Sequence, residues 1–362
     1  MPYEAQMRRL TLDQSLFTTI VEALNHQRNL VADGPWLLSV VDELAGQGAT
    51  SCRYRLQVAN ESGHPGTFFI KQYTDLSSVG REQCQRDGRI ARWLRQELGA
   101  DTELKIAEPL LEMASKRILV SRYIEGENLS PYFFRKLRWH WLPAKSASDL
   151  AELAGRLGKG LMELQMIPAE RVCRFFTETS PPTFFSVIRS QLQSFDTFYA
   201  EADVCAKLVR DVVGRVLVCL EDYRLSGPSY CFQHNDFILQ NLIQGAGGRL
   251  HLFDFANSTV GIASFDMAQM LNSFEDLAYL KTVSTQQIDR LQQAFLAPFQ
   301  QQKNFHGGLL AAMRAYSEFY SGTILLRRTG RFWRHPLRRA LLTPPAQRLE
   351  NRLLSLRDEI RF

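Results

Sequence analysis

The chain has 362 residues, of which 45% are hydrophobic and 22% charged, and its formal net charge is +5. This composition is that of an ordinary globular protein, and the length is sufficient for two domains with cores of their own. No apolar run approaches the length of a membrane span, and the basic residues form no groove-reading motif. We therefore exclude a transmembrane protein and expect no nucleic-acid partner.

The cysteines and the first residues of the chain bear on its compartment. The six cysteines show no paired metal-ligand spacing and are interpreted as buried thiols in a reducing compartment; they stand at 52, 84, 173, 205, 219 and 231. Residues 1–9 lack the apolar stretch of a signal peptide. We therefore expect the protein to be cytoplasmic.

The first third of the chain predicts a helix followed by a small sheet. A helical lead-in over residues 12–30 precedes three strand-like segments at 36–41, 53–58 and 67–73. Gly46 and Gly48 lie in the turn between the first two strands. Such glycines can let backbone amides approach a phosphate, although the pair is a weak signal because glycines are common in hairpins.

Lys71 stands within the last of these strands, at the end of an apolar run. A lysine held on a rigid strand is a natural partner for nucleotide phosphates. A solvated lysine at a sheet edge is the alternative.

A helix over residues 77–98 follows, and one of its stripes is apolar: Cys84, Ala91, Leu94 and Leu98. Asp87 lies on the same stripe, and a buried acid needs a partner. Asp87 is therefore our first choice to pair with Lys71, and Glu82, one turn earlier, is the second. Either acid could instead pair with arginines on the helix surface.

The middle of the chain predicts further helices, over residues 148–165 with Ser148 as the N-cap and over 183–223 as one or two helices. Aromatic and basic residues gather at 127–141 and at 327–339. Either stretch could meet membrane head groups or the phosphorylated core of a glycolipid. Solvated helices with their aromatic rings in the core are the alternative.

The most informative segment is residues 230–243, which contains His234, Asp236 and Asn241. An apolar strand at 230–232 leads into the loop that carries these residues. We expect a second strand, over 250–253, to pair beside it after the turn at 245–248 and to deliver Asp254 at its end.

This pattern suits phosphoryl transfer from a nucleotide. Asp236 would orient the proton of a substrate hydroxyl, while Asn241 and Asp254 would hold Mg²⁺ against the phosphates. Any one of these residues alone could be a structural turn residue, because Asp and Asn side chains often bond to nearby backbone.

With these residues in view, the chain resembles the aminoglycoside phosphotransferase and choline kinase branch of the protein-kinase-like superfamily. The matching segments are the catalytic loop at 234–241, the metal-binding strand end at 252–255, the helix start at 265–271, the helix at 86–94 and the hinge at 119–126. Departures are Ile238–Gln240 in place of a polar turn, Ala256 in place of glycine and Asp87 in place of glutamate.

The resemblance implies an α+β, two-lobed kinase-like fold. Residues 1–122 would form an N-terminal nucleotide-binding lobe with an antiparallel sheet and one helix. Residues 123–362 would form a mainly helical catalytic lobe, with a helical insertion at about 127–227 and a basic segment at about 327–362.

The resemblance also implies ATP and Mg²⁺ as cofactors. Backbone groups around Ser121, Tyr123 and Ile124 would hold the adenine, and His234 and Asp266 would support the catalytic loop. The expected activity is transfer of the γ-phosphate to a hydroxyl of a sugar, amino alcohol or antibiotic-like compound. Two alternatives remain open: a kinase of lipopolysaccharide or another glycolipid at the inner membrane face, and a pseudokinase that serves as a nucleotide-binding scaffold.

Overall fold

The computed structural model describes residues 14–26, 35–44, 51–60, 65–137, 144–177, 181–202, 205–278, 283–302, 305–333 and 336–360. The chain forms two compact units. The first comprises Met1–Gln96, Ile106–Gly126 and Phe253–Ala256, and the second comprises Glu97–Lys105, Glu127–Leu252 and Asn257–Phe362. The boundary expected after residue 122 stays a prediction.

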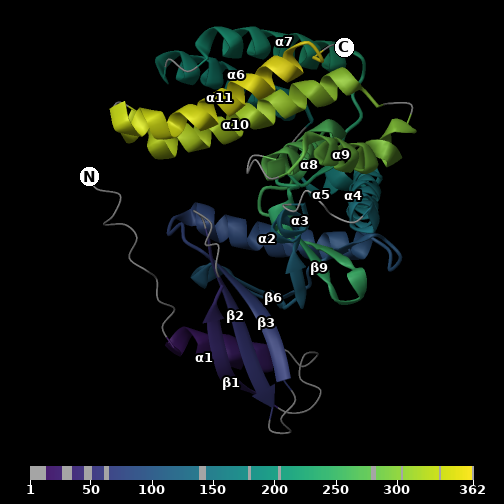
Figure 1. The fold of residues 1–362 in the computed structure, drawn as a ribbon. Helices are drawn as coiled ribbons and strands as arrows, with labels where there is room; N and C mark the ends of the chain where they lie inside the picture. Colours follow the sequence, from purple (N-terminus) through teal and green to yellow (C-terminus); the bar gives the residue numbers. More distant parts are fainter. Residues whose placement is uncertain are drawn as a thin grey trace. The chain divides into compact units, whose positions relative to one another are not determined.

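The first unit is built on an antiparallel sheet whose strands lie in the order β1-β2-β3-β6-β5 (Figure 1). Its strands are β1 (Trp36–Glu43), β2 (Ser51–Asn60), β3 (Pro65–Tyr73), β5 (Pro109–Met113) and β6 (Ile118–Arg122). The strands predicted at 36–41, 53–58 and 67–73 are therefore confirmed as β1, β2 and β3.

One face of this sheet is covered by helix α1 (Gln14–Asn25). Along β2, alternate residues are buried on that face: Tyr54, Leu56 and Val58. They pack against the apolar stripe of α1, which is Phe17, Ile20, Val21 and Leu24. Burial of side chains of this size contributes about 1.5–3 kcal/mol each, so this core holds the sheet and helix together.

The other face of the sheet carries Lys71. Residues that lie directly opposite in an antiparallel ladder share a face. Lys71 of β3 pairs with Arg53 of β2 on one side and with Leu119 of β6 on the other. Helix α2 (Ser78–Glu97), apart from its last residue, belongs to the same unit and confirms the helix predicted at 77–98.

The second unit is mainly helical (Figure 1). Its helices are α3 (Leu129–Leu137), α4 (Ala144–Gln165), α5 (Ala169–Phe175), α6 (Pro181–Ala202), α7 (Ala206–Leu225), α8 (Ala263–Ala278), α9 (Thr285–Gln300), α10 (Gly307–Trp333) and α11 (Pro336–Arg357). Helices α6 and α7 confirm the prediction for residues 183–223. Ser148 is not an N-cap, because α4 begins at Ala144 and Ser148 lies inside the helix.

Short strands complete the fold. They are β4 (Leu104–Ile106), β7 (Gly126–Asn128), β8 (Cys231–Gln233), β9 (Leu242–Gly245), β10 (Leu250–Leu252) and β11 (Thr259–Gly261). One sheet has the order β4-β10-β9-β7, and a two-stranded ladder joins β8 to β11.

The expected pairing of the strand at 250–253 with the strand at 230–232 is wrong. Strand β10 pairs with β9, and β8 pairs with β11. The turn Ala246–Gly248 is only three residues long, and Gly247 takes a positive φ of 71° that favours glycine. So short a turn joins β10 to the segment immediately before it, which is β9.

All six cysteines are free thiols, but only Cys84, Cys219 and Cys231 are buried. Cys52, Cys173 and Cys205 are partly exposed, so the expectation that every thiol is buried is wrong for these three. Within the described part of the chain, no helix combines the length and the apolar character that crossing a membrane requires.

Candidate functional site

In the first unit, Lys71 is held by two carboxylates. Its Nζ lies 3.0 Å from Oδ2 of Asp87 and 2.6 Å from Oδ1 of Asp254. Lys71 and Asp87 are both buried, whereas Glu82 is exposed to solvent. Of the two acids considered for Lys71, Asp87 therefore forms the contact, because it lies on the buried stripe of α2.

Asp87 has two further partners that organise the site. The Tyr73 hydroxyl donates to Oδ2 of Asp87 at 2.5 Å, and the backbone N–H of Phe255 donates to Oδ1 at 2.9 Å. Asp87 thus ties Lys71 to the backbone directly after Asp254. Asp254 itself has a φ of 73°, a left-handed conformation that is strained for a residue with a Cβ and that the surrounding bonds must hold.

The electrostatics of this cluster follow from burial and charge. Burial alone would lower the pKa of Lys71, but the negative charges of Asp87 and Asp254 outweigh it, so the pKa is raised and the lysine keeps its proton. Burial raises the pKa of Tyr73 well above its usual value, and the nearby Asp87 adds to the effect. Tyr73 therefore acts as a hydrogen-bond donor.

Two departures from the family pattern have a packing reason. The methyl group of Ala256 lies in a small apolar cluster with Tyr73, Cys84 and Leu119, where a glycine would leave a gap. Asp87, shorter than the usual glutamate, still reaches Lys71 and also accepts the Phe255 N–H.

In the second unit, Asn241 is bonded to Asp236. The Nδ2 of Asn241 donates to the backbone oxygen of Asp236 at 2.9 Å and to its Oδ2 at 2.8 Å. With Nδ2 engaged, Oδ1 of Asn241 is the oxygen that could bind a cation. The spacing of five residues matters because the 3₁₀ turn Leu239–Asn241 brings Asn241 back towards Asp236.

In the unusual segment Ile238–Gln240, Leu239 is buried, Ile238 is half-buried and Gln240 is exposed. Phe237 and Leu239, on either side of Ile238, are completely buried. Helix α8 binds their backbone, since Phe237 N–H donates to Oε1 of Gln269 at 3.1 Å and Leu239 N–H donates to Oγ of Ser273 at 3.2 Å. An apolar anchor and two side-chain bonds therefore fix the loop.

Asp266, also on α8, supports the start of the loop. It accepts the backbone N–H of His234 at 2.7 Å and that of Asn235 at 2.9 Å. Asn235 has a φ of 66°, so the tight turn before Asp236 depends on these bonds. Burial raises the pKa of Asp266 to about 7, against the two backbone bonds, which lower it. The buried His234 accepts the Asp236 N–H at Nδ1, at 3.3 Å.

The donor atoms fit a hard cation such as Mg²⁺. Of the two residues predicted to hold the ion, Asp254 carries carboxylate oxygens and Asn241 an amide oxygen, and both are ligand types that Mg²⁺ takes in small numbers while keeping water and phosphate in its shell. In the described residues no group of three or more His, Cys, Asp or Glu side chains forms a metal cage.

The remaining residues predicted to bind the nucleotide are Gly46, Gly48, Ser121, Tyr123 and Ile124. Gly46 and Gly48 lie outside the described residues. Ser121 is buried near the end of β6. The backbone N–H of Tyr123 donates to the oxygen of Thr67 at 3.2 Å, so that amide is already used within the sheet edge.

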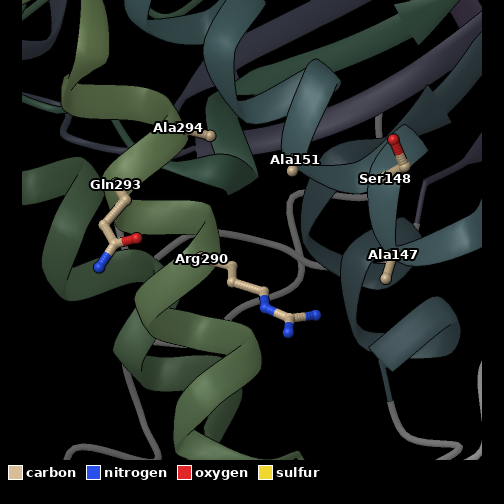
Figure 2. A pocket seen from close by; sticks show the side chains of 6 residues that line it. All are labelled: Ala147, Ser148, Ala151, Arg290, Gln293 and Ala294. Atoms are coloured by element: carbon tan, nitrogen blue, oxygen red, sulfur yellow. The ribbon is translucent and has the colours of Figure 1, made fainter. Parts of the chain in front are cut away.

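A separate hollow lies in the second unit between α4 and α9, with a volume of about 400 Å³ (Figure 2). Three alanines and the side chains of Ser148, Arg290 and Gln293 line it. None of the predicted site residues is part of this lining.

Comparison with known proteins gives the family. The sequence profile of the Phosphotransferase enzyme family matches residues 43–302. The chain belongs to this family. The match confirms the predicted family and the prediction that the protein is a phosphotransferase. None of the curated proteins compared with it matches.

Solved structures confirm the kinase-like α+β fold. An ADP-bound aminoglycoside phosphotransferase, APH(2'')-Ib, is 16% identical with a TM-score of 0.56, and the match covers 97% of this chain and 100% of that one. A gentamicin complex of APH(2'')-IIa is 18% identical with a TM-score of 0.56, covering 97% and 99%. An aminoglycoside phosphotransferase from Alicyclobacillus acidocaldarius is 13% identical with a TM-score of 0.53, covering 92% and 96%.

Three residues at these sites escaped the sequence reasoning. The Tyr73 hydroxyl donates to Asp87, Gln269 accepts the Phe237 N–H in the loop that carries Asp236, and Arg53 lies 3.5 Å from Asp254. The strand alternation of β2 could have placed Arg53 on the face opposite the apolar core. Nothing in the sequence pairs Tyr73 or Gln269 with its partner.

Proposed function

We propose that the protein is an ATP- and Mg²⁺-dependent phosphotransferase that moves the γ-phosphate to a hydroxyl of a small molecule. The observation that carries this proposal is the buried Lys71, charged and bonded to both Asp87 and Asp254. A lysine with two acids in a sheet lobe is the arrangement that phosphate binding in kinases requires. Nucleotide use is further supported by similar structures that contain ADP or ATP.

Each site residue has a proposed role. Lys71 binds phosphate oxygens, and Asp87 holds it in place. Asn241 and Asp254 hold Mg²⁺, which when bound neutralises charge on the phosphates. Asp236 orients the acceptor hydroxyl and takes its proton; its bond to Asn241 fixes the carboxylate for that task. His234 and Asp266 hold the backbone around Asp236. Backbone groups of Ser121 to Ile124 hold the adenine.

The acceptor is proposed as a class: a sugar, an amino alcohol or an antibiotic-like compound. Gentamicin and streptomycin are present in two of the similar structures, which are complexes of the same protein, APH(2'')-IIa. An aminoglycoside is a polycation and calls for an acidic pocket, which the sequence of the helical insertion does not predict. We therefore do not single out aminoglycosides.

The alternatives have less support. For the glycolipid kinase, the stretch at 327–339 has side chains outside the described residues. In the stretch at 127–141, Phe133 is completely buried and Arg135 pairs with Glu127, which favours a core helix over a membrane contact. The pseudokinase alternative has less support because the residues proposed to bind phosphate, metal and acceptor are all present. They are Lys71, Asp236, Asn241 and Asp254.

The proposal is tested by a screen of a metabolite extract with labelled ATP. We expect transfer of label to a small molecule by the wild-type protein and none by Asp236→Ala, which should retain nucleotide binding. Bound nucleotide without transfer to any acceptor would favour the scaffold. Co-sedimentation with anionic liposomes, lost when Arg331, Arg334, Arg338 and Arg339 become Gln, would favour the glycolipid kinase.

A further inference from the structure

Arg53 lies beside Lys71 on the same face of the sheet. The two residues are directly opposite in the β2–β3 ladder, and the alternate residues of β2 that pack on α1 point the other way. The Arg53 Nη2 lies 3.5 Å from Oδ2 of Asp254, while Lys71 binds Oδ1 of the same carboxylate. Asp254 therefore has one cation at each oxygen.

The guanidinium of Arg53 is incompletely bonded. Its distance to Asp254 is longer than the roughly 2.7–2.9 Å of a well-formed charged hydrogen bond. Its Nε is buried and has no hydrogen-bond partner among the described residues. A buried donor without a partner costs free energy and calls for an explanation. An anion with several oxygens, such as a polyphosphate, could accept hydrogen bonds from the guanidinium N–H groups of Arg53.

The next arginine on this face of β2 provides the contrast. Arg55 is bonded at short range, because Nε and Nη2 both donate to Oδ2 of Asp42, at 3.0 and 2.6 Å. Arg55 is thus neutralised by a dedicated acid. Arg53 has no acid of its own in the described residues, since Asp254 is already bonded to Lys71 at 2.6 Å.

We propose that Arg53 is a second phosphate-binding cation of the nucleotide site, contacting the terminal phosphates of a nucleoside di- or triphosphate together with Lys71. This inference rests on the proposed function. The charges of the site support this proposal. The positive charges of Lys71 and Arg53 equal the negative charges of Asp87 and Asp254. A polyphosphate therefore adds its negative charge to a cluster whose own net charge is zero. The Arg53 side chain is 24% exposed, so part of it is open to solvent although Nε is buried. A planar fork also matches phosphate geometry better than a lysine does.

The test compares Arg53→Ala and Arg53→Lys with wild type in nucleotide binding. Affinities for Mg²⁺-ADP and for AMP are measured by displacement of a fluorescent ADP analogue. Arg92→Ala is the matched control, because it removes one positive charge from α2, where Arg92 is half exposed and pairs with Glu112 at 2.7 Å. Circular dichroism and thermal unfolding check that each variant is folded.

For Arg53→Ala we expect Mg²⁺-ADP to bind about ten- to a hundredfold more weakly, the loss of one charge-assisted bond, while AMP changes less than about twofold. Arg53→Lys should recover part of the loss, and Arg92→Ala should match wild type.

Three outcomes would overturn the inference alone: unchanged Mg²⁺-ADP affinity, equal weakening of ADP and AMP, or tighter binding in Arg53→Ala. Tighter binding would indicate that Arg53 pairs with Asp254 and competes with the nucleotide, instead of binding its phosphates. A wild-type protein that binds no nucleotide would overturn the proposed function and this inference together.

Discussion

The carboxylate of Asp254 joins the two cations of the first unit, and Asp87 fixes the backbone beside it through the Phe255 N–H. Asp236, in contrast, accepts a bond from Nδ2 of Asn241 at its carboxylate, and its backbone N–H donates to Nδ1 of His234. The two aspartates therefore have different surroundings. We therefore expect substitution of each aspartate by asparagine to affect nucleotide affinity and kcat differently.

Asp254→Asn should weaken binding of the magnesium nucleotide at least about tenfold, because it removes the negative charge proposed to hold the ion. Asp236→Asn should instead lower kcat by about two to four decades while leaving nucleotide affinity nearly unchanged, because the group that orients the acceptor proton is lost. Calorimetric titration with Mg²⁺-ADP and steady-state kinetics separate the two effects. Equal loss of nucleotide affinity in both variants would contradict the assigned roles.

Asp266 gives a prediction for pH. Burial raises its pKa in the folded protein to about 7, above the value of about 3.9 expected in the unfolded chain. The folded state therefore holds the proton more tightly. As the pH rises from about 4 to 7, the unfolded chain binds fewer protons than the folded one, and the free energy of unfolding falls; above 7 the contribution is constant.

The check is urea unfolding of wild type and Asp266→Asn at several pH values from 5 to 8. Asparagine does not titrate in this range. The variant has one acceptor oxygen fewer for the N–H groups of His234 and Asn235, and this loss lowers its free energy of unfolding by the same amount at every pH. The wild-type free energy of unfolding minus that of the variant should fall between pH 5 and 7, by at most about 1.4 kcal/mol per pH unit. A flat difference would show that the two backbone bonds keep Asp266 ionised throughout.

At the scale of elements, helices α4 and α9 pack closely at a glycine. A Cβ on Gly158 would overlap the backbone oxygen of Phe295, whereas a Cβ on Gly155, one turn earlier, would lie 3.5 Å from the oxygen of Ala294. Gly158 is needed for the close approach of the two backbones, and Gly155 is not.

Gly158→Ala should therefore lower the free energy of unfolding by about 1–3 kcal/mol, the usual cost of overpacking. Gly155→Ala is the matched control and should be neutral or stabilising by up to about 1 kcal/mol, because alanine favours the helix and restricts the unfolded chain. Chemical denaturation of the two variants provides the measurement. A similar loss in both would indicate a general intolerance of α4 to substitution.

The elements also show how far sequence reasoning reaches. The strand patterns predicted β1, β2 and β3, and the spacing of five residues indicated that Asp236 and Asn241 lie together, because both are local patterns. Strand pairing is a tertiary property, so the partner of β10 was mistaken while the short strand β9 went unnoticed. Arg53 was missed for the same reason: its neighbour Asp254 is 201 residues away along the chain.

At the scale of the whole molecule, ligand binding should be visible as stability. A ligand that binds only the folded protein stabilises it in proportion to the logarithm of its concentration over Kd, about 2.7 kcal/mol at a hundredfold excess. The unfolded chain cannot hold this site, because Lys71, Asp87 and Asp254 come from three separate segments of the sequence. Mg²⁺-ADP should therefore raise the unfolding midpoint of the wild-type protein.

Metal removal then identifies the role of the ion. In EDTA the same concentration of ADP should give a clearly smaller shift, because the proposed ligands Asn241 and Asp254 would no longer link the protein to the phosphates through a cation. Asp254→Asn should give a small shift both with and without EDTA, while the exposed-surface variant Arg92→Ala should behave as wild type. Stabilisation that is equal with and without the metal would mean that Lys71 and its neighbours bind the phosphates unaided, and would remove Mg²⁺ from the binding step.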